Sequence, residues 1–181
     1  MEFAYTSLQD VVLIRPRVFG DERGFFMETW QERKFAEAGI KARFVQVNHS
    51  RSRRGVLRGL HYQLPHPQGK LVRVTAGAIY DVAVDLRRSS PTFGHAAGFR
   101  LDADRHEMLW VPEGFAHGFV VLSGEADVLY KVTDFWSPGS EHTLLWNDPA
   151  LAADWPVGEA EVIVNGKDRA GQSFEQCPKF P

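Results

Sequence analysis

The chain has 181 residues and a mass of 20.4 kDa, which is enough for a substantial core, and we expect one domain over residues 1–181. Its apolar fraction of 44% and charged fraction of 24% are those of a globular protein. A net charge of −2 gives no electrostatic reason to expect nucleic acid or a membrane as a partner. The single cysteine, Cys177, excludes an internal disulfide. The sequence has no apolar run near the roughly 20 residues of a membrane span and no signal-like start, so we expect a cytoplasmic protein.

The N-terminal quarter predicts one strand, one turn and one helix. Val11–Val18 is an apolar run that Pro16 should restrict to the edge of a sheet. Asp21–Gly24 predicts a turn. The only convincing helix covers about Gln31–Ala38 and ends at Gly39, a common way for helices to end.

The rest of the chain predicts short strands separated by turn signals such as PTFG, PEG and SPGS. This spacing is typical of an antiparallel β-sandwich or barrel, so we expect an all-β fold with few short helices. The predicted strands are Phe44–Asn48, Val56–Tyr62, Leu71–Thr75, Tyr80–Leu86, Ala96–Leu101, Glu107–Val111, His117–Leu122, Asp127–Thr133 and Thr143–Asn147.

The segment Val56–Val74 carries the most chemical information. It places His61 and Lys70 on two predicted strands joined by a loop. A neutral imidazole can accept a proton near neutral pH, and an ammonium can stabilise the charge formed when a C–H bond beside a carbonyl breaks. Each residue also has a plainer interpretation. His61 could be a structural histidine, and Lys70 could extend its amine from a strand end into solvent.

A parity problem lies between Arg58 and His61. Strict alternation would turn these two side chains to opposite faces of the strand. Gly59 lies between them, and a glycine inside a strand often marks a bulge or a close approach to a ligand. We therefore predict a bulge at Gly59 that brings both side chains to one site.

The run VPEGFAH (Val111–His117) contains the P-x-G-x-x-H pattern that resembles the second half of cupin barrels, a jelly-roll superfamily. A metal-binding cupin would also carry two histidines one residue apart, but that position holds Leu60-His61-Tyr62-Gln63. No such pairing is found at His49, His66, His95, His106 and His142. The sequence therefore predicts a cupin-like barrel without a metal site.

Two further residues and one basic run have unremarkable local surroundings. Tyr130 shares a strand face with Val128 and Val132 and suggests a core aromatic, although a phenol inside a polar barrel could donate a proton. Asp168, in NGKDR, is indistinguishable from a solvated turn residue. The basic run Arg51–Arg54 is interpreted as a solvated loop, with contact to a diphosphate as the alternative.

Sequence blocks spread over nearly the whole chain point to one family. They are DERGFFME, FVQVNHS, GVLRGLHYQ, QGKLVRV, IYDVAVDLR, SPTFG, VPEGFAHGF, YKVTDFWSP, WNDP and KDR. In this order they resemble the dTDP-4-dehydrorhamnose 3,5-epimerases, cofactor-independent enzymes of deoxysugar biosynthesis. The departures are small: Met27 stands where an aromatic is common, and Trp136 where tyrosine is also common.

The resemblance implies a jelly-roll enzyme that needs no cofactor, acts on a dTDP-sugar and forms homodimers whose subunits share strands and site residues. It implies that His61 is the catalytic base, oriented by Asp168, and that Tyr130 is the acid on the opposite face of the sugar. Lys70 would lie against the carbonyl oxygen that becomes an enolate. The implied substrate-binding residues are Arg23, Phe26, Glu28, Gln46, Asn48, Arg58, His117, Trp136 (stacked on the thymine), Glu141 and Lys167.

Three alternatives remain open at the level of sequence. One is an epimerase that inverts a single carbon or acts on another dTDP-4-keto-deoxysugar. Another is a non-catalytic sugar-binding jelly roll, against which the joint presence of His61, Lys70, Tyr130 and Asp168 argues. A metal-dependent cupin is more distant, because its ligands are missing.

Overall fold

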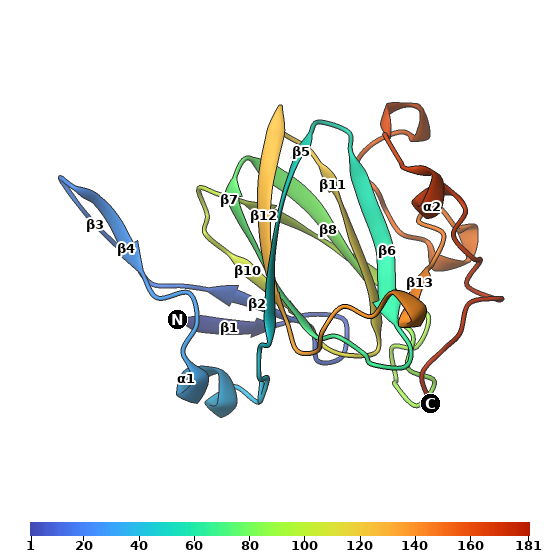
Figure 1. Cartoon of the computed structure of the whole chain (residues 1–181). Helices are drawn as coiled ribbons and strands as arrows, with labels where there is room; N and C mark the ends of the chain where they lie inside the picture. Colours follow the sequence, from blue (N-terminus) through green and yellow to red (C-terminus); the bar gives the residue numbers. More distant parts are fainter.

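Two antiparallel sheets pack face to face and form the barrel at the centre of Figure 1. The computed structural model describes residues 1–181 apart from the side chain of Ala160. A separate two-stranded hairpin, β3 (Val18–Asp21) and β4 (Gly24–Met27), projects away from the barrel. The expected antiparallel all-β fold is confirmed.

The first sheet has six strands in the order β1-β2-β10-β7-β12-β5. All of its pairings are antiparallel, and β5 forms one edge. The strands are β1 (Glu2–Tyr5), β2 (Val12–Arg15), β10 (Met108–Val111), β7 (Lys70–Ala76), β12 (Glu125–Val132) and β5 (Gln46–Arg53).

The second sheet has five strands in the order β13-β6-β11-β8-β9. Most strands lie within a few residues of their predicted positions, but the last begins earlier, at Glu141, and ends where the predicted Thr143–Asn147 strand begins. The strands are β13 (Glu141–Thr143), β6 (Leu57–Gln63), β11 (Phe115–Val121), β8 (Ala78–Asp85) and β9 (Ala96–Asp102).

The prediction of an edge strand at Val11–Val18 is wrong. β2 ends at Arg15, before Pro16, so the proline removes no hydrogen bond from the sheet. β1, which was not predicted, pairs with the outer side of β2 and makes β2 an internal strand.

The predicted helix and turn of this region are confirmed. α1 (Glu32–Glu37) is capped by the Gln31 side chain, whose Oε1 accepts the Lys34 N–H at 2.8 Å, and Gly39 follows with a φ of +81°. The Asp21–Gly24 turn joins the two strands of the hairpin. The other helical segments are α2 (Gly166–Arg169) and 3₁₀ turns at Pro138–Ser140, Pro149–Leu151 and Glu159–Glu161.

Three apolar clusters hold these layers together. The central cluster lies between the sheets and includes Val74, Leu109 and Phe119. α1 covers the outer face of the six-stranded sheet through Phe35, and the chain after β13 covers the outer face of the five-stranded sheet through residues such as Trp146. This packing leaves the polar end of the barrel interior for a site.

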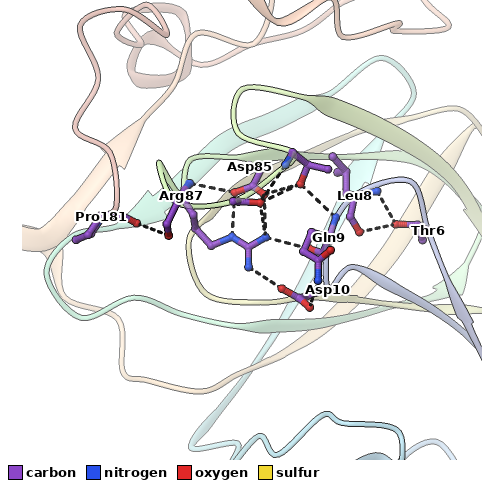
Figure 2. A network of polar contacts seen from close by, with 10 residues as sticks. Thr6, Leu8, Gln9, Asp10, Asp85, Arg87 and Pro181 are labelled. Carbon is purple, nitrogen blue, oxygen red and sulfur yellow. Dashed lines mark hydrogen bonds and ion pairs between the residues drawn. The ribbon is translucent and has the colours of Figure 1, made fainter.

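A polar network joins the end of β8 to both ends of the chain (Figure 2). The carboxylate of Asp85 accepts hydrogen bonds from Nε and Nη2 of Arg87, and Arg87 also reaches Asp10 and the Gln9 carbonyl. Nearby, the hydroxyl of Ser89 donates to the carbonyl of Pro181. Among the described residues, no helix combines the length and the apolar character of a membrane span.

Candidate active site

A cavity of about 430 Å³ opens between the inner faces of the two sheets. It contains all four predicted catalytic residues and six of the predicted binding residues. Its lining consists of Gln46, Asn48, Ser50, Arg58, His61, Gln68, Lys70, His117, Gly118, Phe119, Tyr130, Trp136, Glu141, Asn165 and Asp168.

The predicted bulge exists at Gly59. On β11, Phe119 and His117 are two residues apart, whereas their partners on β6, Arg58 and His61, are three apart. The extra residue restores parity, and both Arg58 and His61 line the cavity. Gly59 has a φ of +127°, and a Cβ there would lie 2.9 Å from the His117 carbonyl oxygen. Only glycine fits this position.

His61 is held by a buried carboxylate. Its Nε2 lies 2.6 Å from Oδ1 of Asp168, and Oδ2 of Asp168 accepts the Gly59 N–H at 3.1 Å. Burial favours a raised pKa for Asp168, but the hydrogen bonds from His61 and Gly59 outweigh it and keep the pKa below the ordinary value. Asp168 is thus a negative charge that fixes the imidazole tautomer and leaves Nδ1 as the basic nitrogen.

Lys70 is buried instead of extending into solvent. It opens β7 with only 7% of its surface exposed, and burial lowers its pKa to about 8 although Asp81 and Glu141 oppose this. Asp81 itself is fully buried, and both of its oxygens lie 2.9 Å from Nε2 of His117. Burial raises the pKa of Asp81, with His117 and Lys70 acting in the other direction.

Tyr130 belongs to the wall opposite His61. It lies on β12 of the six-stranded sheet, next to Asn48 on β5, whereas His61 lies on β6 of the five-stranded sheet. Burial raises the pKa of the Tyr130 phenol, partly offset by Arg58, so the phenol is protonated at neutral pH. A molecule in the cavity can therefore have a base on one side and a proton donor on the other.

Trp136, Glu141 and Lys167 form a group at the side of the cavity. Glu141 Oε2 accepts the Trp136 indole N–H at 3.4 Å and lies 2.5 Å from the Lys167 amine. Burial favours a raised pKa for Glu141, but Lys167 and His61 outweigh it and hold the pKa below its ordinary value. Lys167 therefore contacts the site through Glu141 and does not line the cavity itself.

Comparisons with known proteins place this geometry in a family. A family model described as dTDP-4-dehydrorhamnose 3,5-epimerase matches residues 5–176. The dTDP-4-dehydrorhamnose 3,5-epimerase of Pseudomonas aeruginosa is 56% identical over 182 residues, which covers 100% of both chains. The chain belongs to the dTDP-4-dehydrorhamnose 3,5-epimerase family.

Solved structures similar to the chain include more than one kind of epimerase. The dTDP-6-deoxy-D-glucose-3,5-epimerase RmlC of Legionella pneumophila, in complex with dTDP-4-keto-L-rhamnose, has a TM-score of 0.94 at 48% identity and covers 98% of this chain and 94% of its own. ChmJ, a 3'-monoepimerase from Streptomyces bikiniensis in complex with dTDP-quinovose, has a TM-score of 0.87 at 30% identity, with 94% and 86% covered. The chain is an epimerase of this family, with the jelly-roll-like fold that its structures share.

Besides Lys167, three binding residues implied by the family resemblance do not line this cavity. Arg23 pairs with Asp21 within the hairpin, the Phe26 ring is 70% exposed, and Glu28 lies 2.6 Å from Lys34. In Figure 1 the hairpin points away from the barrel that contains the cavity.

The interpretation of Arg51–Arg54 as a loop is wrong, because β5 continues to Arg53. Arg51 pairs with Asp127 on the neighbouring strand, and the run lies outside the cavity lining. Sequence reasoning also missed Asp81 as a site residue. An aspartate in the middle of an otherwise apolar strand was the available signal.

Proposed function

We propose that the protein inverts carbons 3 and 5 of dTDP-4-dehydro-6-deoxyglucose to give dTDP-4-dehydrorhamnose, as a step of dTDP-L-rhamnose biosynthesis. The observation that carries the proposal is the pair His61 and Tyr130 on opposite walls of one cavity, with the buried amine of Lys70 in the same cavity. The 56% identity to an enzyme of this name supports the choice of substrate.

The chemistry follows from the ketone at carbon 4 of that sugar. The C–H bonds at carbons 3 and 5 are both alpha to the carbonyl, so removing either proton gives an enolate. His61 would remove the proton, assisted by Asp168, and the Lys70 ammonium would stabilise the oxyanion. Tyr130 would return a proton from the other face and invert the centre. A general base contributes about 10²–10⁴-fold, and one lost oxyanion donor costs roughly 3–4 kcal/mol.

The nucleotide half of the substrate has matching partners in the cavity. The Arg58 guanidinium can bind diphosphate oxygens through paired hydrogen bonds, and the exposed ring of Trp136 offers a flat surface for thymine. We propose Gln46, Asn48, His117, Glu141 and Lys167 as further binding residues.

A second candidate function is inversion at carbon 3 alone. Its support is the similarity to the 3'-monoepimerase ChmJ, but at 30% identity that similarity is weaker than the 48% to RmlC, a 3,5-epimerase. The catalytic residues proposed here would serve either reaction.

Deuterium labelling distinguishes these functions. The protein is incubated with dTDP-4-dehydro-6-deoxyglucose in deuterated water, and incorporated deuterium is located by NMR. Label at both carbons is the expected result, and label at carbon 3 alone would indicate a monoepimerase. A sugar that remains unlabelled would contradict the catalytic function for this substrate.

We further propose that the protein acts in the cytoplasm as a homodimer and that the β3–β4 hairpin of one subunit completes the cavity of the other. Arg23, Phe26 and Glu28 then reach a substrate from the partner subunit. The rings of Phe19, Phe25 and Phe26 are between 51% and 70% exposed, and such a cluster is typical of an interaction surface.

Mixing two inactive variants tests the shared site. One variant carries Arg23→Ala and Phe26→Ser, and the other carries His61→Ala. Co-refolded in equal amounts, they should regain about a quarter of the wild-type activity, because half of the dimers contain one intact site. If each cavity works alone, mixing restores nothing. Each variant alone is the control.

A further inference from the structure

The loop that carries Trp136 is held mainly through its backbone. Residues 133–137 lie between β12 and a 3₁₀ turn and belong to no strand or helix. The indole ring is 57% exposed and the neighbouring Phe135 ring 64% exposed, so burial does little to fix either side chain. The orientation of the ring therefore depends on the indole N–H bond to Glu141 and on the polar contacts that hold the loop backbone.

Three glutamines form hydrogen bonds with the backbone of four consecutive residues of the loop. Gln68 Nε2 donates to the Asp134 carbonyl at 2.8 Å, and Gln46 Oε1 accepts the Trp136 N–H at 3.1 Å. Gln63 provides the other two bonds: its Nε2 donates to the Phe135 carbonyl at 3.2 Å, and its Oε1 accepts the Ser137 N–H at 2.8 Å. The Gln63 amide thus holds the backbone of the residues on both sides of Trp136.

The position of Gln63 suits this task. It is the last residue of β6, two positions after His61, and only 3% of its surface is exposed. Its Nε2 also donates to the His66 carbonyl at 2.7 Å, so both polar atoms of the amide have partners. A buried amide with satisfied partners is rigid, and it connects the strand of the base to the loop of the aromatic ring.

We propose that Gln63 is a positioning residue that sets the plane of the Trp136 ring for stacking on the nucleobase and so determines affinity for the nucleotide half of the substrate. This inference rests on the proposed function, in which Trp136 binds the thymine. Gln63 acts through Trp136 and takes no part in proton transfer. Its loss should therefore raise KM and leave kcat nearly unchanged.

Calorimetry with dTDP, together with steady-state kinetics, tests the proposal. Gln63→Met keeps the length of the side chain and removes all three hydrogen bonds. We expect about tenfold weaker binding of dTDP and a similar rise in KM, since stacking on an aromatic ring contributes about that much or more to affinity. The change in kcat should stay within about twofold. Gln176→Met, at an exposed position, is the matched control and should change neither constant.

A double-mutant cycle with Trp136→Ala identifies the route of the effect. In the Trp136→Ala background, Gln63→Met should weaken dTDP binding by less than about twofold. An equal loss with and without the indole ring, an unchanged affinity, or a fall in kcat at constant KM would each overturn the proposal.

A second variant covers the case in which Gln63→Met does not fold. Gln63→Glu keeps the shape and the bond from Ser137 but removes both N–H donors, and it should weaken dTDP binding in the same coupled way. The wild-type protein distinguishes a failure of the proposed function from a failure of the inference about Gln63. Wild-type protein that neither binds dTDP nor exchanges deuterium would overturn the proposed function and this inference together, whereas an active wild type with an unaffected Gln63→Met variant overturns only the inference.

Discussion

His61 and Tyr130 suit different roles because their surroundings differ. The imidazole is held through Nε2 by the anionic carboxylate of Asp168, whereas burial raises the pKa of the Tyr130 phenol and keeps it protonated. Two groups whose surroundings separate their roles in this way are a common basis for acid and base assignments.

Substituting each residue should affect a different step. His61→Ala should abolish deuterium exchange at both carbons, because no base remains. Tyr130→Phe should slow inversion more than proton removal, so that label appears at carbons that have kept their configuration. NMR of the labelled sugar measures both steps, and an equal loss of both in Tyr130→Phe would argue against its role as the acid.

Lys70 should limit activity at alkaline pH. Burial lowers its pKa to about 8, and only the protonated amine stabilises an oxyanion. The value of kcat/KM should therefore fall as the pH rises through about 8. The Tyr130→Phe variant should keep this limb in its residual activity, because burial raises the pKa of Tyr130 and the phenol does not titrate there. A limb that disappears in Tyr130→Phe would assign it to the phenol instead.

The sequence predicted which residues lie together in the cavity better than it predicted how deeply each of them is buried. His61 and Arg58 could be placed on one strand, and the parity argument even located the bulge. Asp168 could not be recognised locally, because its burial depends on contacts with His61 and Gly59, which lie 107 and 109 positions earlier in the sequence. The burial of Lys70 beside Asp81 likewise follows from the packing of two sheets, which no local pattern encodes.

At the scale of elements, the bulge in β6 connects backbone geometry to catalysis. One extra residue turns His61 and Arg58 to the same side, and Gly59 allows β6 and β11 to approach closely. The wrong prediction of an edge strand at Val11–Val18 also concerns the end of a strand. Pro16 constrains a strand only if it lies within that strand, and strand ends are the least certain part of a sequence prediction.

Gly59→Ala should damage both stability and activity. Its Cβ would lie 2.6 Å from the Gly118 Cα, at a φ of +127° that side chains rarely adopt. We expect a loss of about 2–4 kcal/mol in the free energy of unfolding and a displaced His61. Urea denaturation and kcat/KM measure the two effects. Gly124→Ala, where nothing lies within 4 Å of the added Cβ, should change the free energy of unfolding by less than about 1 kcal/mol.

At the scale of the molecule, the ends of the chain are tied to the barrel near β8. The buried carboxylate of Asp85 accepts bonds from Arg87, Ser90 and Thr92, and Arg87 continues to the N-terminal loop (Figure 2). The all-β class and most strands could be predicted from alternation and turn residues. The pairing order of the strands and this network could not, because they join residues far apart in the sequence.

Arg87→Leu should destabilise the fold by about 3–5 kcal/mol, because it leaves the buried Asp85 carboxylate without its cation. Burial favours a raised pKa for Asp85, but Arg87, Ser90 and Thr92 outweigh it and hold the pKa below 3.8. The contribution is therefore present above that pH and lost as the pH falls further. Urea denaturation at pH 7 and pH 3 should show a smaller difference from wild type at pH 3.

Arg88→Leu is the control for this prediction, since Arg88 is exposed and lies over the Phe93 ring. It should cost less than about 1 kcal/mol. A similar loss in both variants would indicate that the effect comes from apolar packing and not from the Asp85 charge.

The place of Asp168 after all the barrel strands sets an order of events during synthesis. The last barrel strand, β13, ends at Thr143, so the ribosome makes the whole barrel before the carboxylate that orients His61. A nascent chain that has not yet reached Asp168 would hold its imidazole without its partner. Catalytic competence would then arrive only with the segment that adds Asn165 and Asp168 to the cavity wall.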